Sequence, residues 1–139
     1  RLGLLHEATE VIDELIMLPA VGQGALGIET RERDFQMQAI LAPLNHADSA
    51  SGTKAERALL RKLEGGCQVP IGAHGRVIDG ELHLKAYVGS LTGHRAVRGN
   101  IAGSPDNADS LGVQLANQLL REGADQILRG VRDSIEAHE

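Results

Sequence analysis

The sequence predicts an α+β fold in which a three-stranded antiparallel meander carries helices packed on one face. Three observations support this fold class. Apolar and polar residues alternate between residues 69 and 101, an Asp-Gly pair at 79–80 joins two of the alternating runs, and apolar residues recur at helical spacing before and after them. Because a half-apolar sheet and amphipathic helices bury one another, residues from about 52 onward should form a self-sufficient module.

Composition limits the class of protein. The chain of 139 residues has no tryptophan, and its only aromatic side chains are Phe35 and Tyr87, so the core must be aliphatic. A net charge of −5 disfavours a nucleic-acid partner. A single cysteine excludes an internal disulfide, and no apolar run is long enough for a membrane span, which indicates a cytoplasmic protein. The six histidines show no metal-ligand spacing, so no metal site is expected.

Residues 1–45 are predicted to contain helical and extended segments that have no partner strands within the sequence. Apolar spacing predicts a helix over residues 4–16, and Pro19 favours an extended stretch around it. A strand is expected over residues 25–28, followed by a short helix that Asp34 caps. Since none of these extended pieces has a visible partner strand, this region is expected to dock on residues absent from the chain or on a second copy. The chain also starts at Arg1 on helix-like sequence, which indicates a fragment.

The helix that leads to the sheet is predicted to follow a loop ending at Gly52. Thr53 and Glu56 have the spacing of a capping box, and Gly65 should end the helix. Its basic side chains could attract an anion, but a solvated face is the favoured interpretation. These side chains are Lys54, Arg57, Arg61 and Lys62.

The sheet and the last helices follow in order. The third strand is predicted over residues 95–101, after alternating runs on both sides of the Asp-Gly turn. Ser104 and Pro105 should start a helix that Gly123 ends. A final helix carries the apolar residues Ile127, Leu128, Val131 and Ile135.

The lone cysteine, Cys67, lies between the predicted helix and the predicted sheet. Two preceding glycines, Gly65 and Gly66, would present its side chain rather than bury it. From the residues alone, a small buried side chain is still favoured, because free cysteines are usually buried. A Cys-His hydrolase would need His74 or His83 to approach the thiol, and nothing in the sequence supports that arrangement.

A second glycine-rich stretch, Gly22–Gly27, matches the G-x-G-x-x-G dinucleotide fingerprint. The fingerprint requires a strand before it and a helix opening inside it, but here the residues after Gly24 read as a strand and no helix-start signal occurs before Asp34. Asp48 has a plausible spacing for a ribose ligand, yet no second strand leads to it. The favoured interpretation is a crossing where two backbones approach closely.

Two motifs together resemble the porphobilinogen deaminase family. They are Leu63-Glu-Gly-Gly-Cys-Gln-Val-Pro-Ile-Gly72 and Leu18-Pro-Ala-Val-Gly-Gln-Gly-Ala-Leu-Gly-Ile-Glu29, with Ala55-Glu-Arg57 between them. The resemblance implies that Cys67 carries a covalent dipyrromethane cofactor through a thioether. It also implies that Gln23 faces the cofactor or the growing pyrrole chain, and that Gly66 and Gln68 flank the attachment site.

The same resemblance implies an activity and a domain plan. The family joins four porphobilinogen units into hydroxymethylbilane on the cofactor. Residues 1–45 would be the tail of domain two and the return crossing to domain one, both α/β domains. Residues 46–51 would be a linker, and residues 52–139 the C-terminal cofactor-anchoring domain.

Several expectations follow from that plan. No catalytic residue is assigned in this chain, because the family's catalytic aspartate has no counterpart here. The isolated chain should therefore be inactive, with Cys67 unmodified, whereas the full-length protein should be a monomer. Self-association of the fragment through residues 1–45 stays open. A non-catalytic or accessory module that holds a pyrrole cofactor or docks on other domains is the alternative.

Overall fold

The protein is described by a computed structural model that covers residues 3–63 and 69–136. Strands β1 (Ile71–Ile78), β2 (Glu81–Gly89) and β3 (Ala96–Gly103) form one antiparallel sheet in the order β1-β2-β3. Each strand pairs with the next along the chain, so the predicted meander is confirmed.

The turn between β1 and β2 also has the predicted form. Ile78 pairs with Glu81, which leaves Asp79 and Gly80 as a two-residue connection. Their φ angles are 50° and 82°, and a type I′ turn needs positive φ at both central positions. The limits of the third strand differ from the prediction, because pairing of β3 with β2 continues as far as Gly103.

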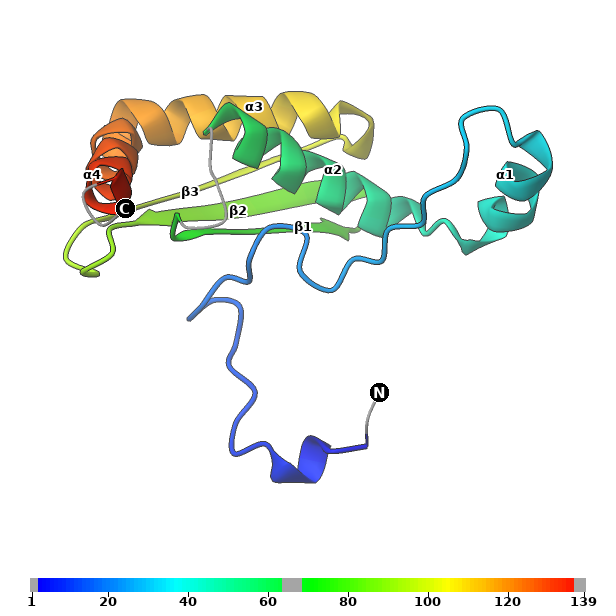
Figure 1. Cartoon of the computed structure of the whole chain (residues 1–139), viewed down its shortest axis with the longest axis horizontal. Helices are drawn as coiled ribbons and strands as arrows, with labels where there is room; N and C mark the ends of the chain where they lie inside the picture. The colour runs from blue at the N-terminus through cyan, green and yellow to red at the C-terminus, as the bar shows by residue number, and fades with distance from the viewer. Residues whose placement is uncertain (1–2, 64–68, 137–139) are drawn as a thin grey trace.

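Helices cover one face of the sheet (Figure 1). α2 (Ala47–Lys62) and α3 (Ala108–Leu119) lie across that face, and α4 (Asp125–Glu136) packs at its end. The 3₁₀ turn η3 (Pro105–Asn107) precedes α3, and Gly123, with a φ of 106°, separates the α3 helical run from α4. The predicted helix start at Ser104 and Pro105 and the predicted stop at Gly123 are therefore confirmed.

The core between sheet and helices is aliphatic, as the composition predicts. It is formed where the inward face of the sheet meets the apolar stripes of the three helices, and the two described aromatic side chains take no part in it. Burial of this set supplies the main stabilisation of the module, at about 25 cal/mol per Å² of apolar surface. The fully buried large side chains are Leu59, Leu63, Leu82, Leu84, Leu115, Leu119, Leu128 and Val88.

α2 begins earlier than predicted. Its first residue is Ala47, and the ring Nδ1 of His46 accepts a hydrogen bond from the N–H of Ser49 at 3.3 Å. The expected loop up to Gly52 and the expected capping box at Thr53 are therefore wrong. A histidine ring takes the capping role that Ser, Thr, Asp and Asn usually fill, which is why the sequence signal was missed.

The region before α2 has little regular structure. It contains the 3₁₀ turn η1 (Leu5–Glu7), the helix α1 (Phe35–Leu41) and the 3₁₀ turn η2 (Ala42–Leu44). Asp34 caps α1 by accepting from the N–H of Met37, as predicted.

Two other predictions for this region are wrong: residues 4–16 do not form a long helix, and residues 25–28 do not form a strand. The apolar side chains of residues 4–16 stay exposed in the described part of the chain, whereas helical stability comes mostly from packing of such a stripe. Among the described residues, all but three of the exposed large apolar side chains lie between Leu4 and Leu44. No described helix is both long and apolar enough to cross a bilayer.

Two helical glycines give a matched test of the packing. A Cβ at Gly112 would overlap the carbonyl oxygen of Ala55 where α3 crosses α2, whereas a Cβ at Gly130 in α4 would meet no atom within 4 Å. We expect Gly112→Ala to lower the free energy of unfolding by about 1–3 kcal/mol. Gly130→Ala should raise it by about 0.5–1 kcal/mol through helix propensity. Urea unfolding of the two variants checks this, and equal stabilities would contradict the packing.

Proteolysis tests the difference between the two halves. The side chain of Arg31 is 91% exposed, and Arg33 is also exposed in a stretch without regular structure. We expect trypsin at low concentration to cut after these residues first, because cleavage needs local unfolding that costs least where few apolar contacts hold the chain. Arg61 in α2 and Lys85 in β2 are the matched controls, and a first cut at either would contradict this view. Mass spectrometry of a time course identifies the fragments.

Candidate functional site

The predicted attachment site lies in the link between α2 and β1. Leu63, which caps the end of α2, and Ile71, the first residue of β1, are both buried, so the two ends of the link are held in the core. Cys67, Gly66 and Gln68 lie outside the described residues. The boundary from helix to sheet falls where the sequence predicts it, and the roles of these three residues stay predictions.

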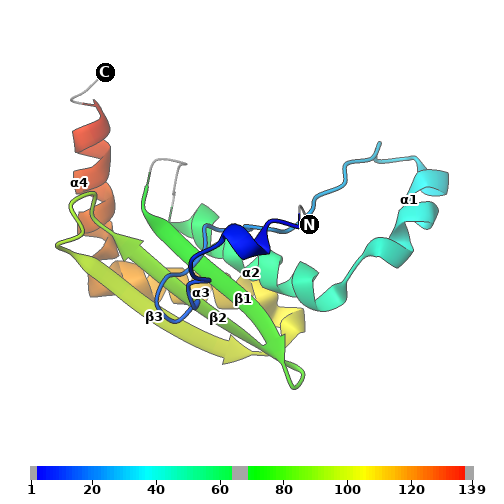
Figure 2. The ribbon, with the colours of Figure 1, turned by 90° about the horizontal axis from the view of Figure 1, so that it is seen from below.

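Residues 14–24, here called the crossing segment, run beside the free edge of β1 (Figure 2). Ala20 forms an isolated antiparallel bridge with Gly72, and the N–H of Ala73 donates to the carbonyl of Pro19 at 3.0 Å. An exposed strand edge readily pairs with another chain, so this contact also protects β1. The crossing segment is thus attached where β1 emerges from the link.

The crossing segment ends in a tight double turn that carries Gln23. The N–H of Gln23 donates to the carbonyl of Ala20 at 3.0 Å, and the N–H of Ala25 donates to that of Gly22 at 3.1 Å. Gly22 and Gly24 have φ angles of 69° and 81°, which only glycine adopts without strain. The side chain of Gln23 is exposed and has no hydrogen-bond partner among the described residues, so it is available to a ligand.

A residue that the sequence analysis misread, Glu56, joins these parts. Its carboxylate accepts from the N–H of Gly22 at 2.6 Å and from the N–H of Gly75 at 2.7 Å. The side chain is 6% exposed, and it is the only charged residue buried in the described part of the chain. The sequence did contain a signal that Glu56 is buried. Glu56 follows Gly52 by one helical turn and precedes Leu63 by two turns, so it lies on the inward stripe of α2.

The dinucleotide fingerprint lacks its structural context. No strand precedes Gly22 in the described residues, and the next helix after Gly27 begins only at Phe35. Asp48 lies in the first turn of α2. Among the described residues, no helix opens inside the glycine-rich stretch, as the dinucleotide fingerprint requires for binding a pyrophosphate. The alternative interpretation as a close backbone crossing fits the contacts of Gly22 and its neighbours.

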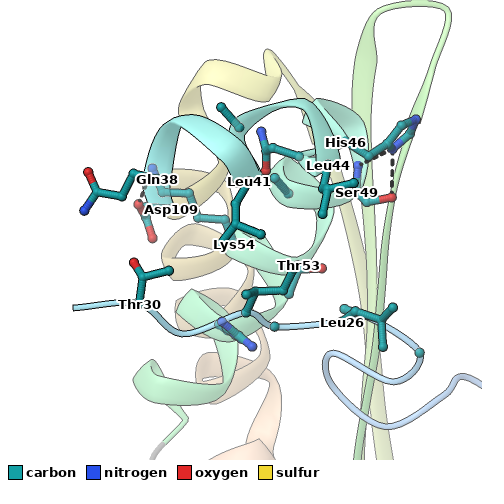
Figure 3. A pocket seen from close by; sticks show the side chains of 18 of the residues that line it. Leu26, Thr30, Gln38, Leu41, Leu44, His46, Ser49, Thr53, Lys54 and Asp109 are labelled. Carbon is teal, nitrogen blue, oxygen red and sulfur yellow. Dashed lines mark hydrogen bonds and ion pairs between the residues drawn. The ribbon is translucent and has the colours of Figure 1, made fainter. Parts of the chain in front are cut away.

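A cavity of about 970 Å³ lies between residues 24–30, the α1–η2 region and α2 (Figure 3). Its wall is apolar on the side of residues 24–28 and polar along α2. Lys54 and Arg61 both reach Asp109 of α3, at 2.9 and 3.2 Å, and both side chains are more than half exposed. For Lys54 and Arg61, the interpretation as a solvated helix face rather than an anion-binding face therefore holds. Arg57 also lines the cavity, without an ion pair among the described residues.

The two histidines considered as partners of the thiol, His74 and His83, lie close to carboxylates. Nδ1 of His74 lies 2.8 Å from a carboxylate oxygen of Glu14 in the crossing segment, and Nε2 of His83 lies 3.5 Å from one of Glu81. These pairs are partly exposed and contribute little stability. In the described part of the chain, no group of three or more His, Cys, Asp or Glu side chains is arranged to hold a metal ion.

Two family profiles match separate parts of the chain. The profile described as "Porphobilinogen deaminase, C-terminal domain" matches residues 50–121. The profile described as "Porphobilinogen deaminase, dipyromethane cofactor binding domain" matches residues 1–39. Cys67 lies within the first of these matches and Gln23 within the second.

Curated relatives agree with the profiles. A porphobilinogen deaminase of Chlorobium luteolum is 48% identical over 138 residues, which are 96% of this chain and 44% of the relative. Those of Chlorobium phaeobacteroides and Chlorobium phaeovibrioides are each 46% identical over 136 residues, with 95% of this chain and 44% of the relative covered. The chain thus spans less than half the length of these relatives. Both of its parts match the same family, and the chain belongs to the porphobilinogen deaminase family.

Proposed function

We propose that the chain acts as the cofactor-anchoring C-terminal portion of a porphobilinogen deaminase, a transferase that joins four porphobilinogen units into hydroxymethylbilane. The observation that carries this proposal is the 46–48% identity to porphobilinogen deaminases over at least 95% of the chain. The proposed domain plan keeps the sequence-based limits of 1–45, 46–51 and 52–139, and residues 47–51 of its linker form the start of α2. It is supported by the separate profile matches and by the concentration of exposed apolar side chains before residue 45.

Cys67 is the proposed attachment point of the dipyrromethane. A thiol suits this task because sulfur is a soft nucleophile for the methylene carbon of an aminomethylpyrrole. The C–S bond forms as the C–N bond breaks, ammonia leaves, and the thiol proton is released. When bound, the cofactor supplies the free pyrrole end to which porphobilinogen units are added. The chain's own contribution is a tether whose two ends are held in the core.

The crossing segment fits a place beside that tether. The described residues that flank the link lie next to the turn bearing Gln23, whose amide can hydrogen-bond a pyrrole N–H or a carboxylate. Gly66 and Gln68 are the proposed neighbours of the thioether. Arg57 on α2, which has no ion-pair partner among the described residues, adds a positive charge that suits a cofactor bearing carboxylates.

The remaining properties are proposed on similar grounds. The partners would be porphobilinogen and the growing linear pyrrole chain, with no nucleic acid. A cytoplasmic location is supported by the single cysteine. The full-length protein would be a monomer, while the isolated chain could associate through residues 1–45, where most exposed apolar side chains lie.

A hybrid protein tests the anchoring role. Residues 1–139 would replace the matching part of the Chlorobium luteolum enzyme, and intact mass would be compared with and without Cys67→Ser. We expect the hybrid to carry a covalent two-pyrrole adduct and the variant to carry none, with unfolding temperatures within about 3 °C because a link residue contributes little packing. An adduct that survives Cys67→Ser would refute the assignment. An unmodified hybrid would favour the accessory-module alternative.

The isolated chain gives a second test. Incubated with porphobilinogen, it should neither consume the substrate nor gain mass at Cys67, because no catalytic residue is assigned within it. Absorbance of the substrate's dye adduct and intact mass measure the two outcomes, with the hybrid as the active control. Turnover by residues 1–139 alone would contradict the proposed division of labour.

A further inference from the structure

Glu56 contacts three parts of the molecule at once. It lies on α2, one of its carboxylate oxygens accepts from Gly75 on β1, and the other accepts from Gly22 at the turn of the crossing segment. α2 and β1 are the two elements that flank residues 64–68. One side chain therefore joins the two elements that flank the Cys67 link, α2 and β1, to the turn that carries Gln23.

The local backbone explains how Glu56 reaches both donors. A Cβ at Gly75 would lie 2.7 Å from the carbonyl oxygen of Gly52, so α2 and β1 approach more closely here than any side chain would allow. Gly52 is one helical turn before Glu56. The close approach brings the carboxylate to the free edge of β1, where Gly75 offers its N–H. A Cβ at either glycine would overlap the backbone of the other, so α2 and β1 would have to shift apart.

The cost of burying the carboxylate of Glu56 makes its two hydrogen bonds specific. A buried carboxylate is costly unless its oxygens are hydrogen-bonded, and here each oxygen has one backbone N–H. Among the described residues it has no ion-pair partner, so these two donors are what balance its charge. Hydrogen bonds to a charged acceptor are roughly twice as strong as neutral ones. The turn at Gly22 is therefore bound to a fixed point of the module rather than only lying near it.

We infer that Glu56 is a positioning residue: its carboxylate holds the Gly22–Gly24 turn, and with it Gln23, in a fixed place relative to α2 and β1, the two elements that flank the Cys67 link. The structural part of this inference concerns residues of this chain alone. Its consequence for chain extension rests on the proposed function.

Amide hydrogen exchange measured by NMR on the whole chain tests the structural part. Gly24 lies in the same turn, and its N–H has no partner among the described residues, so it is an internal reference. We expect the amide of Gly22 to exchange at least roughly tenfold more slowly than that of Gly24 after correction for sequence. Equal rates would overturn the inference, and this comparison needs no variant.

Glu56→Gln extends the test with nearly the same shape. The amide group that replaces one oxygen cannot accept, so it would face a backbone N–H with another donor. We expect exchange at Gly22, at Gly75 or at both to accelerate roughly tenfold or more. Leu115→Ala, a buried residue away from the turn, controls for general loss of stability, and Glu29→Gln on the exposed stretch controls for loss of charge. Unchanged exchange at both glycines in Glu56→Gln would overturn the inference.

The hybrid protein tests the consequence. A misplaced Gln23 or Cys67 link should lower kcat by roughly tenfold or more while changing KM less, since orientation of reacting groups is lost. Leu115→Ala with a similar loss of unfolding temperature should keep kcat. Equal effects of the two variants on kcat would reduce Glu56 to a structural residue and overturn the positioning role. An inactive wild-type hybrid would refute the proposed function, whereas the exchange experiment would still decide whether Glu56 holds the turn.

Discussion

The backbone contact between α2 and β1 at Gly52 and Gly75 is the constraint on which the site depends. It sets the helix against the sheet edge closely enough for the carboxylate of Glu56 to reach a strand N–H. From that position the same side chain also reaches Gly22. Two residues without side chains thus decide where a charged group can be buried.

The two halves of the chain are stabilised in different ways. From residue 47 onward, sheet and helices bury one continuous aliphatic core, and the backbone groups are paired in helices and strands. Before that residue the chain has few regular elements. Its attachment to the rest consists of a small set of hydrogen bonds, mostly along one strand edge, and the packing of Val21 against the core. Polar attachment of this kind is directional, so it can define a position without contributing much stability.

The contacts of α2, β1 and the crossing segment provide a physical basis for the proposed anchoring role. The proposed covalent anchor at Cys67 would need two things: ends that do not move and a neighbouring surface of defined position. Leu63 and Ile71 supply the first by burial, and the crossing segment supplies the second through Glu56 and the edge of β1. The exposed apolar side chains between Leu4 and Leu44 show that this neighbouring surface is only partly covered by the described residues.

The sequence by itself determined the elements whose signals are local or strongly periodic. The elements that were predicted correctly each depend on a few adjacent residues. They are the alternation of apolar and polar residues in β2, the Asp79–Gly80 turn, the cap at Ser104 and the stop at Gly123. The two family motifs likewise identified the family, because they are long and occur in the right order.

Only the tertiary structure decided the rest. The apolar stripe of residues 4–16 predicted a helix that does not form. Such a stripe indicates a face that needs to be buried, but it does not indicate whether a surface that could bury it is present. Glu56 looked like half of a capping box, yet its role depends on Gly22 and Gly75, which are 34 and 19 residues away along the chain. Contacts at such separation leave no pattern in the neighbouring residues, since they arise from how α2, β1 and the crossing segment pack together.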